Sequence, residues 1–157
     1  MHRERPFVLA VDGQEHGVHY TPAESDTTLF GGNSNWRGPV WFPVNYLLVE
    51  ALERYHHFYG DGLRVECPTG SGRMMDLGQV AQEPYRRLGG LFIPDADGIR
   101  PCHGRDRRFR DDPYWRDLVT FAEYFCGDSG RGIGARYQGW TALAIRCFED
   151  MARSRAG

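Results

Sequence analysis

Lysine is absent from this 157-residue sequence, so all 19 of its basic residues are arginine. They are balanced by 21 acidic residues, which leaves a formal net charge of −2. Nucleic-acid-binding domains usually gather an excess of positive charge on one surface, and this composition gives no electrostatic reason to expect such a partner. We attribute the preference for arginine to coding bias rather than to function.

Long apolar runs are also missing. A membrane-spanning helix needs about 18 or more consecutive apolar residues, and no stretch of the sequence approaches that length. The longest early apolar run, Phe7–Val11, is too short for the core of a signal peptide. We therefore expect a cytoplasmic protein that has no membrane partner.

Cysteine is scarce, and its four positions are far apart. They lack the C-x-x-C spacing of zinc and redox sites, and the four cysteines and six histidines show no ligand spacing typical of a metal site. We therefore expect free, buried thiols, no metal site and no cofactor. His103 falls in a loop without a ligand-like neighbour, so the sequence assigns it no role. The cysteines are Cys67, Cys102, Cys126 and Cys147.

The remaining composition, 41% hydrophobic and 25% charged, is typical of a soluble globular domain. Apolar residues at helical spacing predict four helices, over 43–59, 75–88, 112–126 and 141–151. Pro84 is expected to kink or split the second helix, because proline removes a backbone hydrogen bond. The first helix carries a regular apolar stripe that we expect to be buried: Val44, Leu47, Leu48, Ala51, Leu52, Tyr55 and Phe58.

Turn residues between short apolar segments predict two β-hairpins. The first spans residues 7–20 around Asp12-Gly13, a pair that tolerates positive φ. The second joins 91–94 to 99–102 through a glycine-containing turn. Residues 21–41 read as a loop, and a loop of about twenty residues without regular structure is usually functional.

The stretch 30–46, FGGNSNWRGPVWFPVNY, is rich in tryptophan, phenylalanine, asparagine and glycine. Flat aromatic faces pack on the apolar faces of sugar rings, while asparagine and arginine side chains hydrogen-bond hydroxyl groups. This composition indicates a carbohydrate site. The alternative is equally compatible with composition: Trp36, Trp41 and Phe42 would then be ordinary core aromatics at the start of a helix.

Four further segments follow the aromatic stretch: VECPTGSG at 65–72, DPYWRDL at 112–118, AEYFCGDSGRGIGA at 122–135 and GWTAL at 139–143. In order and spacing, the five segments resemble the C-terminal part of the catalytic domain of glycoside hydrolase family 63, the group of processing α-glucosidases and mannosylglycerate hydrolases. The resemblance extends from about Phe7 to about Phe148.

The resemblance implies a mainly α fold with small β-hairpins between the helices. The family's catalytic domain is an (α/α)6 barrel, of which four helices would form the C-terminal third. Residues 1–157 would then be one partial domain, with residues 1–20 as a hairpin that leads into it. We expect the missing N-terminal part of the barrel, from the same gene or a separate chain, or self-association to cover the apolar surface that a partial barrel exposes.

Hydrolysis of a glycosidic bond typically takes two carboxyl groups, and Glu123 is the best candidate for one of them. Near the end of the expected helix 112–126, the helix dipole would raise its pKa a little and suit a base. The resemblance likewise places the family's general base at Glu123, where it would activate water in an inverting mechanism. The family's general acid is an aspartate upstream of these residues, so we expect negligible hydrolysis by the isolated chain.

The resemblance also implies a wall that binds an oligosaccharide or glycoside. Trp36 and Trp41 would stack on the sugar, and Asn35 and Arg37 would donate hydrogen bonds to its hydroxyl groups. Two more residues have two possible roles each. Glu66 either hydrogen-bonds a sugar or braces the loop after it, with bracing favoured; Trp140 either lines the site or packs between helices.

The sequence departs from the family pattern at two places. Pro84 lies in a segment that the family keeps helical, and one residue is missing between Arg136 and Gly139, just before GWTAL.

From the resemblance as a whole, the leading hypothesis is a fragment of an inverting glycoside hydrolase acting on α-linked sugars. The alternative is a non-catalytic carbohydrate-binding or interaction module derived from such an enzyme.

Overall fold

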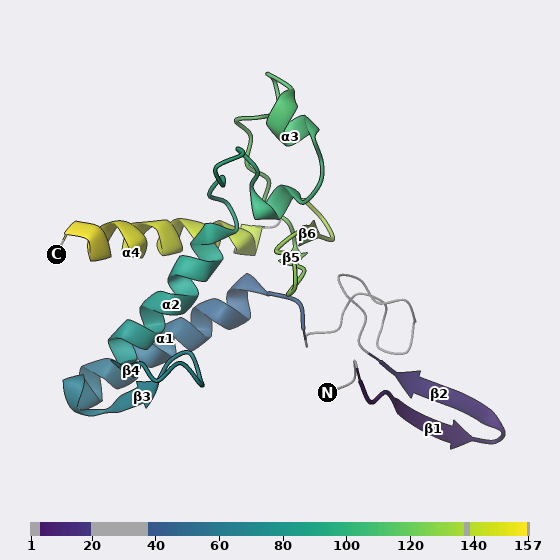
Figure 1. Ribbon diagram of the computed structural model, residues 1–157, viewed down its shortest axis with the longest axis horizontal. Coiled ribbons are helices and arrows are strands. Elements are labelled where there is room, and N and C mark those ends of the chain that lie inside the picture. The colour runs from purple at the N-terminus through teal and green to yellow at the C-terminus, as the bar shows by residue number, and fades with distance from the viewer. Residues whose placement is uncertain (1–3, 20–37, 137–138, 157) are drawn as a thin grey trace.

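The computed structural model describes residues 4–19, 38–136 and 139–156. These residues form a mainly α structure with three small antiparallel hairpins (Figure 1). The helices are α1 (Phe42–Tyr59), α2 (Leu77–Gly90), α3 (Arg108–Asp111) and α4 (Ala144–Ala156). The strands are β1 (Phe7–Val11), β2 (Gln14–Val18), β3 (Arg64–Glu66), β4 (Met74–Asp76), β5 (Tyr124–Phe125) and β6 (Gly132–Ile133). Three short 3₁₀ turns lie at Gly60–Gly62, Pro101–His103 and Gly139–Leu143.

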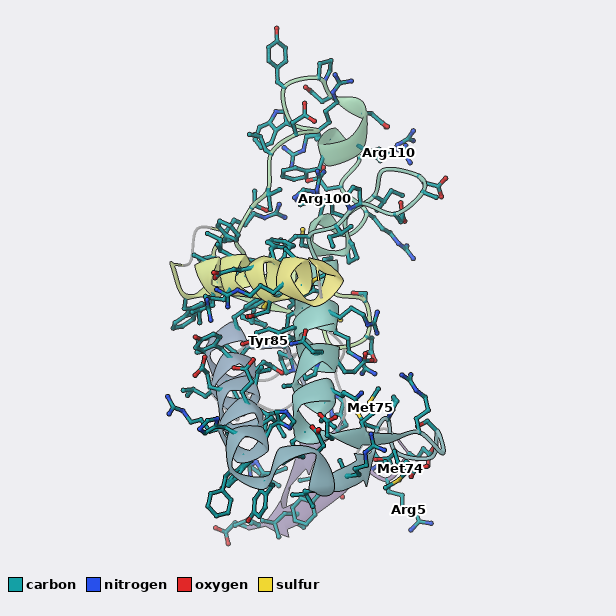
Figure 2. The ribbon with its side chains drawn as sticks, turned by 90° about the vertical axis from the view of Figure 1, so that its left-hand side faces the viewer. Arg5, Met74, Met75, Tyr85, Arg100 and Arg110 are labelled. Carbon is teal, nitrogen blue, oxygen red and sulfur yellow. The ribbon has the colours of Figure 1, made fainter. Side chains whose placement is uncertain are left out.

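Helices α1, α2 and α4 enclose the main core. The first two lie side by side, and α4 crosses them at one end (Figures 1 and 2). Phe42, Val49 and Tyr85 are fully buried between them, and Phe92 and Phe125 extend the core toward the loops. Figure 2 shows Tyr85 of α2 next to α4, with Met74 and Met75 of β4 at the far end of the helix pair.

The helices predicted over 43–59 and 141–151 are confirmed as α1 and α4. The helix predicted over 75–88 is confirmed as α2, with a shifted start. It begins at Leu77 because Asp76 caps it: the Asp76 carboxylate accepts from the Gln79 N–H at 2.9 Å, and the Gln79 side chain accepts from the Asp76 N–H. Pro84 lies within a continuous helix, so the expected split does not occur. The first hairpin is also confirmed, with Asp12 and Gly13 both at positive φ in its turn.

The prediction of a helix over 112–126 is wrong. The Asp112 side chain caps only a single turn, in which it accepts from the Tyr114 N–H at 2.8 Å. The chain then runs irregularly into β5, where Phe125 exchanges backbone hydrogen bonds with Val40 and Tyr124 pairs with Ile133. Long-range pairing of these residues therefore overrides the local helical spacing.

The second predicted hairpin is also corrected. A turn does close at Asp95–Gly98, with the Asp95 N–H donating to the Ile99 carbonyl at 2.9 Å. The flanking residues, however, form no strand, because Pro101 begins a 3₁₀ turn at Pro101–His103 instead of continuing a ladder.

The burial of α1 is the reverse of the predicted pattern. The expected buried stripe is largely exposed, with Leu47 at 68% and Phe58 at 80% of full exposure. The face turned toward α2 and α4 instead carries polar residues as well as Phe42 and Val49, among them Tyr46 and Glu53. Apart from Ala51 and Leu52, which are half-buried, the apolar stripe therefore has no cover within the part of the chain that the structure describes.

Candidate functional site

A short ladder brings the aromatic stretch against the AEYFCGDSGRGIGA segment. The Val40 N–H donates to the Phe125 carbonyl at 2.8 Å, and the Phe125 N–H donates back to Val40 at 3.0 Å. Close approach of Gly38 and Gly127 continues this contact, because a Cβ on Gly127 would collide with the Gly38 carbonyl oxygen. This pairing places Trp41, the residue after Val40, against Tyr124 of β5.

Trp41 packs between two aromatic residues from distant segments. Its ring stacks on Tyr124 at a centroid distance of 4.5 Å and meets the edge of Trp140 at 6.1 Å. Only 4% of Trp41 is exposed, whereas Trp140 is 37% exposed. In the described chain Trp41 therefore packs as a core aromatic, which is the alternative that its composition left open, and Trp140 lies at the surface beside it.

Glu123 directly precedes β5 and is half-buried. Its backbone N–H donates to the Ala135 carbonyl at 2.7 Å, and its Oε2 accepts from the Ala135 N–H at 3.2 Å. The carboxylate lies against Gly134, whose positive φ and missing side chain make room for it. The other oxygen, Oε1, has no hydrogen-bond partner among the described residues, so it is left to accept from solvent or a ligand.

The GWTAL segment fixes the backbone on the other side of Glu123. The Trp140 indole N–H donates to the Glu123 carbonyl at 2.9 Å. The hydroxyl of the fully buried Thr141 donates to the Ala122 carbonyl at 2.6 Å. Trp41, Glu123 and Trp140 therefore form one cluster, held by three of the five segments that carry the family resemblance. We call these three residues, with Tyr124, the Glu123 cluster.

Glu123 does not lie near the end of a helix, so the helix-dipole argument for its role as a base does not apply. What the structure supplies is a carboxylate with one tethered and one available oxygen, on a residue whose backbone carbonyl accepts from the partly exposed indole of Trp140. A carboxylate with an available oxygen can accept a proton from a bound water.

Glu66 lies elsewhere and braces a loop. Its Oε1 accepts from the Gly72 N–H at 2.6 Å, and hydrogen bonds from the backbone of Gly70 and Gly72 lower its pKa. It also lines an open cavity of about 610 Å³ between α1, α2 and the β3–β4 loop. Neither Glu123 nor Trp140 is among the described residues that line this cavity. The contact with Gly72 agrees with the bracing role, and sugar binding by Glu66 stays a prediction.

The other predicted wall residues, Asn35, Trp36 and Arg37, lie outside the described residues. Tyr124 and Thr141 help to build the surroundings of Glu123, and the sequence did not indicate either of them. Tyr124 follows Glu123 in the expected helix 112–126, and helical spacing there gives no sign that Tyr124 stacks on Trp41. Thr141 carries no sequence signal of its own, because a buried hydroxyl at a helix start is common.

None of the four cysteines, all of which the structure describes, is in a disulfide; Cys102, Cys126 and Cys147 are buried as predicted, whereas Cys67 is only half-buried. Burial raises the pKa of both Cys102 and Cys147 to about 11, so neither is a reactive thiolate near neutral pH. Within residues 4–19, 38–136 and 139–156, no group of three or more metal-ligating side chains is close enough to hold an ion.

None of the described helices combines the length and apolar character needed to cross a membrane.

The chain is similar to a segment of a much longer protein. It is 49% identical over 156 residues to "Uncharacterized protein YMR196W" of Saccharomyces cerevisiae. The match covers 98% of this chain and 14% of the yeast protein, so the chain spans about one seventh of that relative. No protein-family model matches the chain, and no solved structure matches it.

Proposed function

We propose that this chain is a segment of an inverting glycoside hydrolase that acts on α-linked sugars and is similar to family 63. Glu123 is its general base, and Trp140 contributes to the sugar-binding surface. The general acid belongs to a part of the barrel that lies outside this chain. Hydrolysis then requires the rest of that barrel, and the isolated chain is inactive.

The observation that carries the proposal is the convergence on Glu123. Segments 38–41, 122–135 and 139–143 are far apart in the sequence, and each contacts the Glu123 cluster through a backbone hydrogen bond or a ring contact. The half-buried Glu123 has its backbone and one carboxylate oxygen held by contacts from Ala135 and Trp140. A catalytic carboxylate must be held within a few tenths of an ångström of its working position.

The exposed stripe of α1 supports the assignment to a partial barrel. Val44, Leu47, Leu48, Tyr55 and Phe58 follow helical spacing as if for burial, yet all are exposed. In an (α/α)6 barrel a neighbouring helix would cover such a stripe. The yeast relative, of which the match covers 14%, has ample length for the remaining helices.

The test replaces the matching segment of the yeast protein with this chain, with and without Glu123→Gln. We expect the chimera to hydrolyse α-glucosides, and Glu123→Gln to lower kcat by at least about 100-fold, the smaller end of general-base effects. Because the amide keeps the size and position of the side chain, KM should change little. Glu15→Gln, in the exposed β1–β2 hairpin, is the matched control and should leave kcat unchanged.

Two outcomes would contradict the proposal. Full activity of the Glu123→Gln chimera would exclude Glu123 as the base. Hydrolysis by the isolated 157-residue chain, lost in Glu123→Gln, would show a complete site and contradict the missing acid. Binding of an oligosaccharide by the chimera without hydrolysis would instead favour the non-catalytic carbohydrate-binding module.

A further inference from the structure

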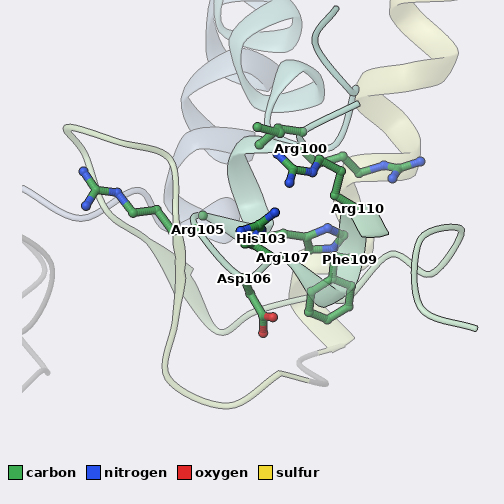
Figure 3. Close-up of a pocket in the computed structure, with 9 residues that line it drawn as sticks. Arg100, His103, Arg105, Asp106, Arg107, Phe109 and Arg110 are labelled. Carbon is green, nitrogen blue, oxygen red and sulfur yellow. The ribbon is translucent and has the colours of Figure 1, made fainter. Parts of the chain in front are cut away.

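A second cavity lies at the opposite end of the described chain from the β3–β4 hairpin, next to α3 and the Pro101–His103 turn. It has a volume of about 380 Å³, and its lining includes Arg100, His103, Arg105, Arg107, Phe109 and Arg110. Figure 3 shows the His103 ring between Arg100 and Phe109. Figure 2 places Arg100 and Arg110 beyond α4, away from Met74 and Met75. None of the residues of the Glu123 cluster lines this cavity.

His103 is the unusual residue of this cavity. It is only 5% exposed, and its ring stacks on Phe109 at a centroid distance of 3.9 Å. Neither of its ring nitrogens has a hydrogen-bond partner among the described residues. Buried polar atoms in native proteins are nearly always hydrogen-bonded, because leaving one unpaired costs about 1–3 kcal/mol. Two such atoms on one ring that lines a cavity leave two hydrogen-bonding positions that a ligand or a water can fill.

The protonation state of His103 determines which hydrogen-bonding groups such a ligand must carry. Burial lowers the pKa of His103, and the positive charges of Arg100 and Arg136 lower it further, against a smaller opposing effect of Asp106. The imidazole is therefore neutral at physiological pH and presents one N–H donor and one acceptor nitrogen.

The charge around His103 is strongly positive. Arg100 donates to the carbonyls of Phe92 at 3.1 Å and Arg116 at 3.0 Å, which are neutral acceptors. No carboxylate pairs with Arg100 or with Arg105 within the part of the chain that the structure describes. These two guanidinium groups therefore keep an uncompensated positive charge at the cavity.

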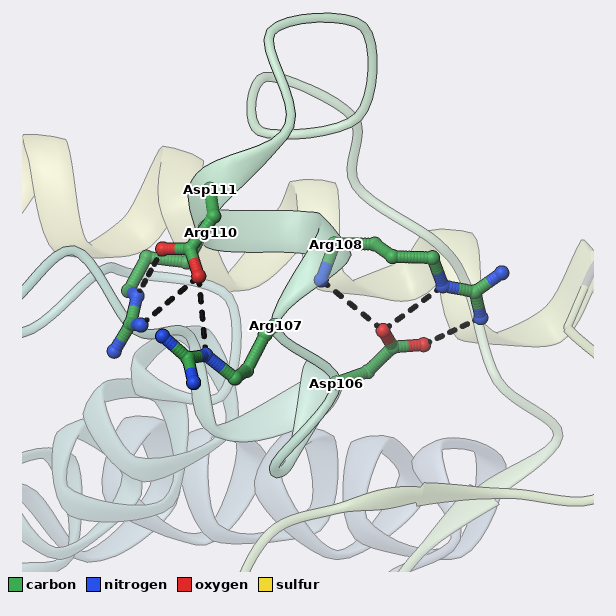
Figure 4. A network of polar contacts seen from close by, with 5 residues as sticks. All are labelled: Asp106, Arg107, Arg108, Arg110 and Asp111. Atoms are coloured by element: carbon green, nitrogen blue, oxygen red, sulfur yellow. Dashed lines mark hydrogen bonds and ion pairs between the residues drawn. The ribbon is translucent and has the colours of Figure 1, made fainter.

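The nearby carboxylates are already occupied by other arginines (Figure 4). Asp106 accepts from Nε and Nη2 of Arg108 at 3.0 and 2.7 Å, and this pairing lowers its pKa to about 2. Asp111 accepts from both Arg107 and Arg110, which lowers its pKa as well. The cavity lining thus contains four arginines and one carboxylate, and that carboxylate is itself paired.

We propose that this cavity binds a small organic anion whose phosphate or carboxylate group pairs with Arg100 and accepts from the His103 N–H. Arginine is suited to both groups because its guanidinium carries five N–H donors and a fixed positive charge. In Arg100, Nε and Nη1 donate to the two carbonyls, and Nη2 takes part in neither contact. The Phe109 ring and the apolar stems of the arginines accept the organic part of the ligand. The cavity volume is in the range of sites for small molecules. This inference is independent of the proposed hydrolase function.

The test titrates the 157-residue chain with inorganic phosphate, phenyl phosphate and benzoate at constant ionic strength. Calorimetry gives the affinity, and the NMR shifts of the His103 imidazole, assigned with His103→Gln, report on the site. We expect saturable binding that shifts the His103 signals. If both phenyl phosphate and inorganic phosphate bind, the site recognises a phosphate group. If only benzoate binds, the site recognises a carboxylate.

Arg100→Gln is expected to weaken binding at least tenfold. Because Arg100 also joins two loops, the double variant Arg105→Gln/Arg107→Gln provides a second test at exposed positions, with an expected loss of at least threefold. Arg153→Gln, an exposed arginine on α4 that pairs with Glu149, is the matched control and should leave the affinity unchanged. The proposal is overturned if no probe shifts the His103 signals at tens of millimolar, or if the variants and Arg153→Gln bind alike.

Discussion

The buried hydroxyl of Thr141 donates a 2.6 Å hydrogen bond to the carbonyl of Ala122, the residue before Glu123. The adjacent Trp140 donates from its indole N–H to the Glu123 carbonyl at 2.9 Å. Two consecutive residues of one segment thus hold two consecutive carbonyls of another. The position of the Glu123 carboxylate depends on this double contact, because Glu123 is not in a helix that would fix its backbone.

Thr141→Val removes the donor while keeping the shape of the side chain. The Ala122 carbonyl would then be left without its buried partner, so we expect the free energy of unfolding to fall by about 1–3 kcal/mol. Urea denaturation followed by tryptophan fluorescence measures this loss. Thr120→Val is the matched control: Thr120 is half-buried and makes no hydrogen bond through its hydroxyl with the described residues, so a change within about 0.5 kcal/mol is expected. Equal losses in the two variants would show that the Thr141 hydrogen bond contributes nothing.

Gly127→Ala tests the contact that places Trp41 on β5. A methyl group at Gly127 would collide with the backbone carbonyl of Gly38, which cannot move without breaking the Val40–Phe125 pairing. We expect destabilisation of about 1–3 kcal/mol, the usual range for overpacking, together with a change in tryptophan fluorescence as Trp41 leaves Tyr124.

Gly90→Ala is the control for the Gly127 substitution. Gly90 lies in the last turn of α2 with open space where a Cβ would be. Alanine favours helix over glycine by up to about 1 kcal/mol, so stability should hold or rise. If Gly127→Ala were as harmless as Gly90→Ala, the Gly38–Gly127 contact would not be needed to build the site.

Local patterns in the sequence were sufficient for α1, α2, α4 and the β1–β2 hairpin. Each has a strong local signal, such as the Asp76 cap of α2 or the Asp12-Gly13 turn. The neighbourhood of Glu123 could not be predicted in this way. Tyr124 and Phe125 are paired with Ile133 and Val40, and nothing in residues 112–126 alone distinguishes these partners from a helical repeat.

The anion cavity shows a different limit of sequence reasoning. The sequence around His103 has no metal-ligand spacing, and the importance of His103 comes from burial next to Phe109 and from the arginines around it. Only the structure shows that Asp106 and Asp111 pair with other arginines, so that neither carboxylate neutralises the positive charge of Arg100 or Arg105.

The raised pKa of Glu53 leads to a prediction of how the free energy of unfolding changes with pH. Burial raises its pKa above the usual range, with Asp150 and Glu50 adding to the effect and with Tyr85 and Arg146 opposing it. A carboxyl group with a raised folded pKa binds its proton more tightly in the folded state. Its favourable contribution is complete below the unfolded pKa, about 4.3 for glutamate, and is lost as the pH rises through the folded pKa.

Glu53→Gln should therefore raise the free energy of unfolding at pH 7 and reduce the loss of stability between mildly acidic and neutral pH. The amide keeps an acceptor for the nearby Tyr85 hydroxyl and removes the charge. Urea denaturation at a series of pH values measures both effects, and Glu15→Gln on the exposed hairpin serves as the control. A Glu53→Gln variant that is less stable at neutral pH would show that the carboxylate is favourably paired.

The exposed stripe of α1 leads to the last prediction. Leu47 and Phe58 are 68% and 80% exposed and make up part of an apolar surface that the described chain does not cover. Apolar surfaces of this kind promote association, so the isolated chain should self-associate with rising concentration. Leu47→Gln/Phe58→Gln should abolish that association and change the free energy of unfolding by less than about 1 kcal/mol, because exposed side chains contribute little to stability.

Analytical ultracentrifugation measures the association, and urea denaturation at low concentration measures the stability. Val49→Gln on the same helix is the contrasting substitution: Val49 is fully buried, so its replacement should destabilise the fold by several kcal/mol. If Leu47→Gln/Phe58→Gln destabilised the chain as much as Val49→Gln, α1 would bury its apolar stripe within this chain. A partial barrel that needs further helices to cover α1 would then be excluded.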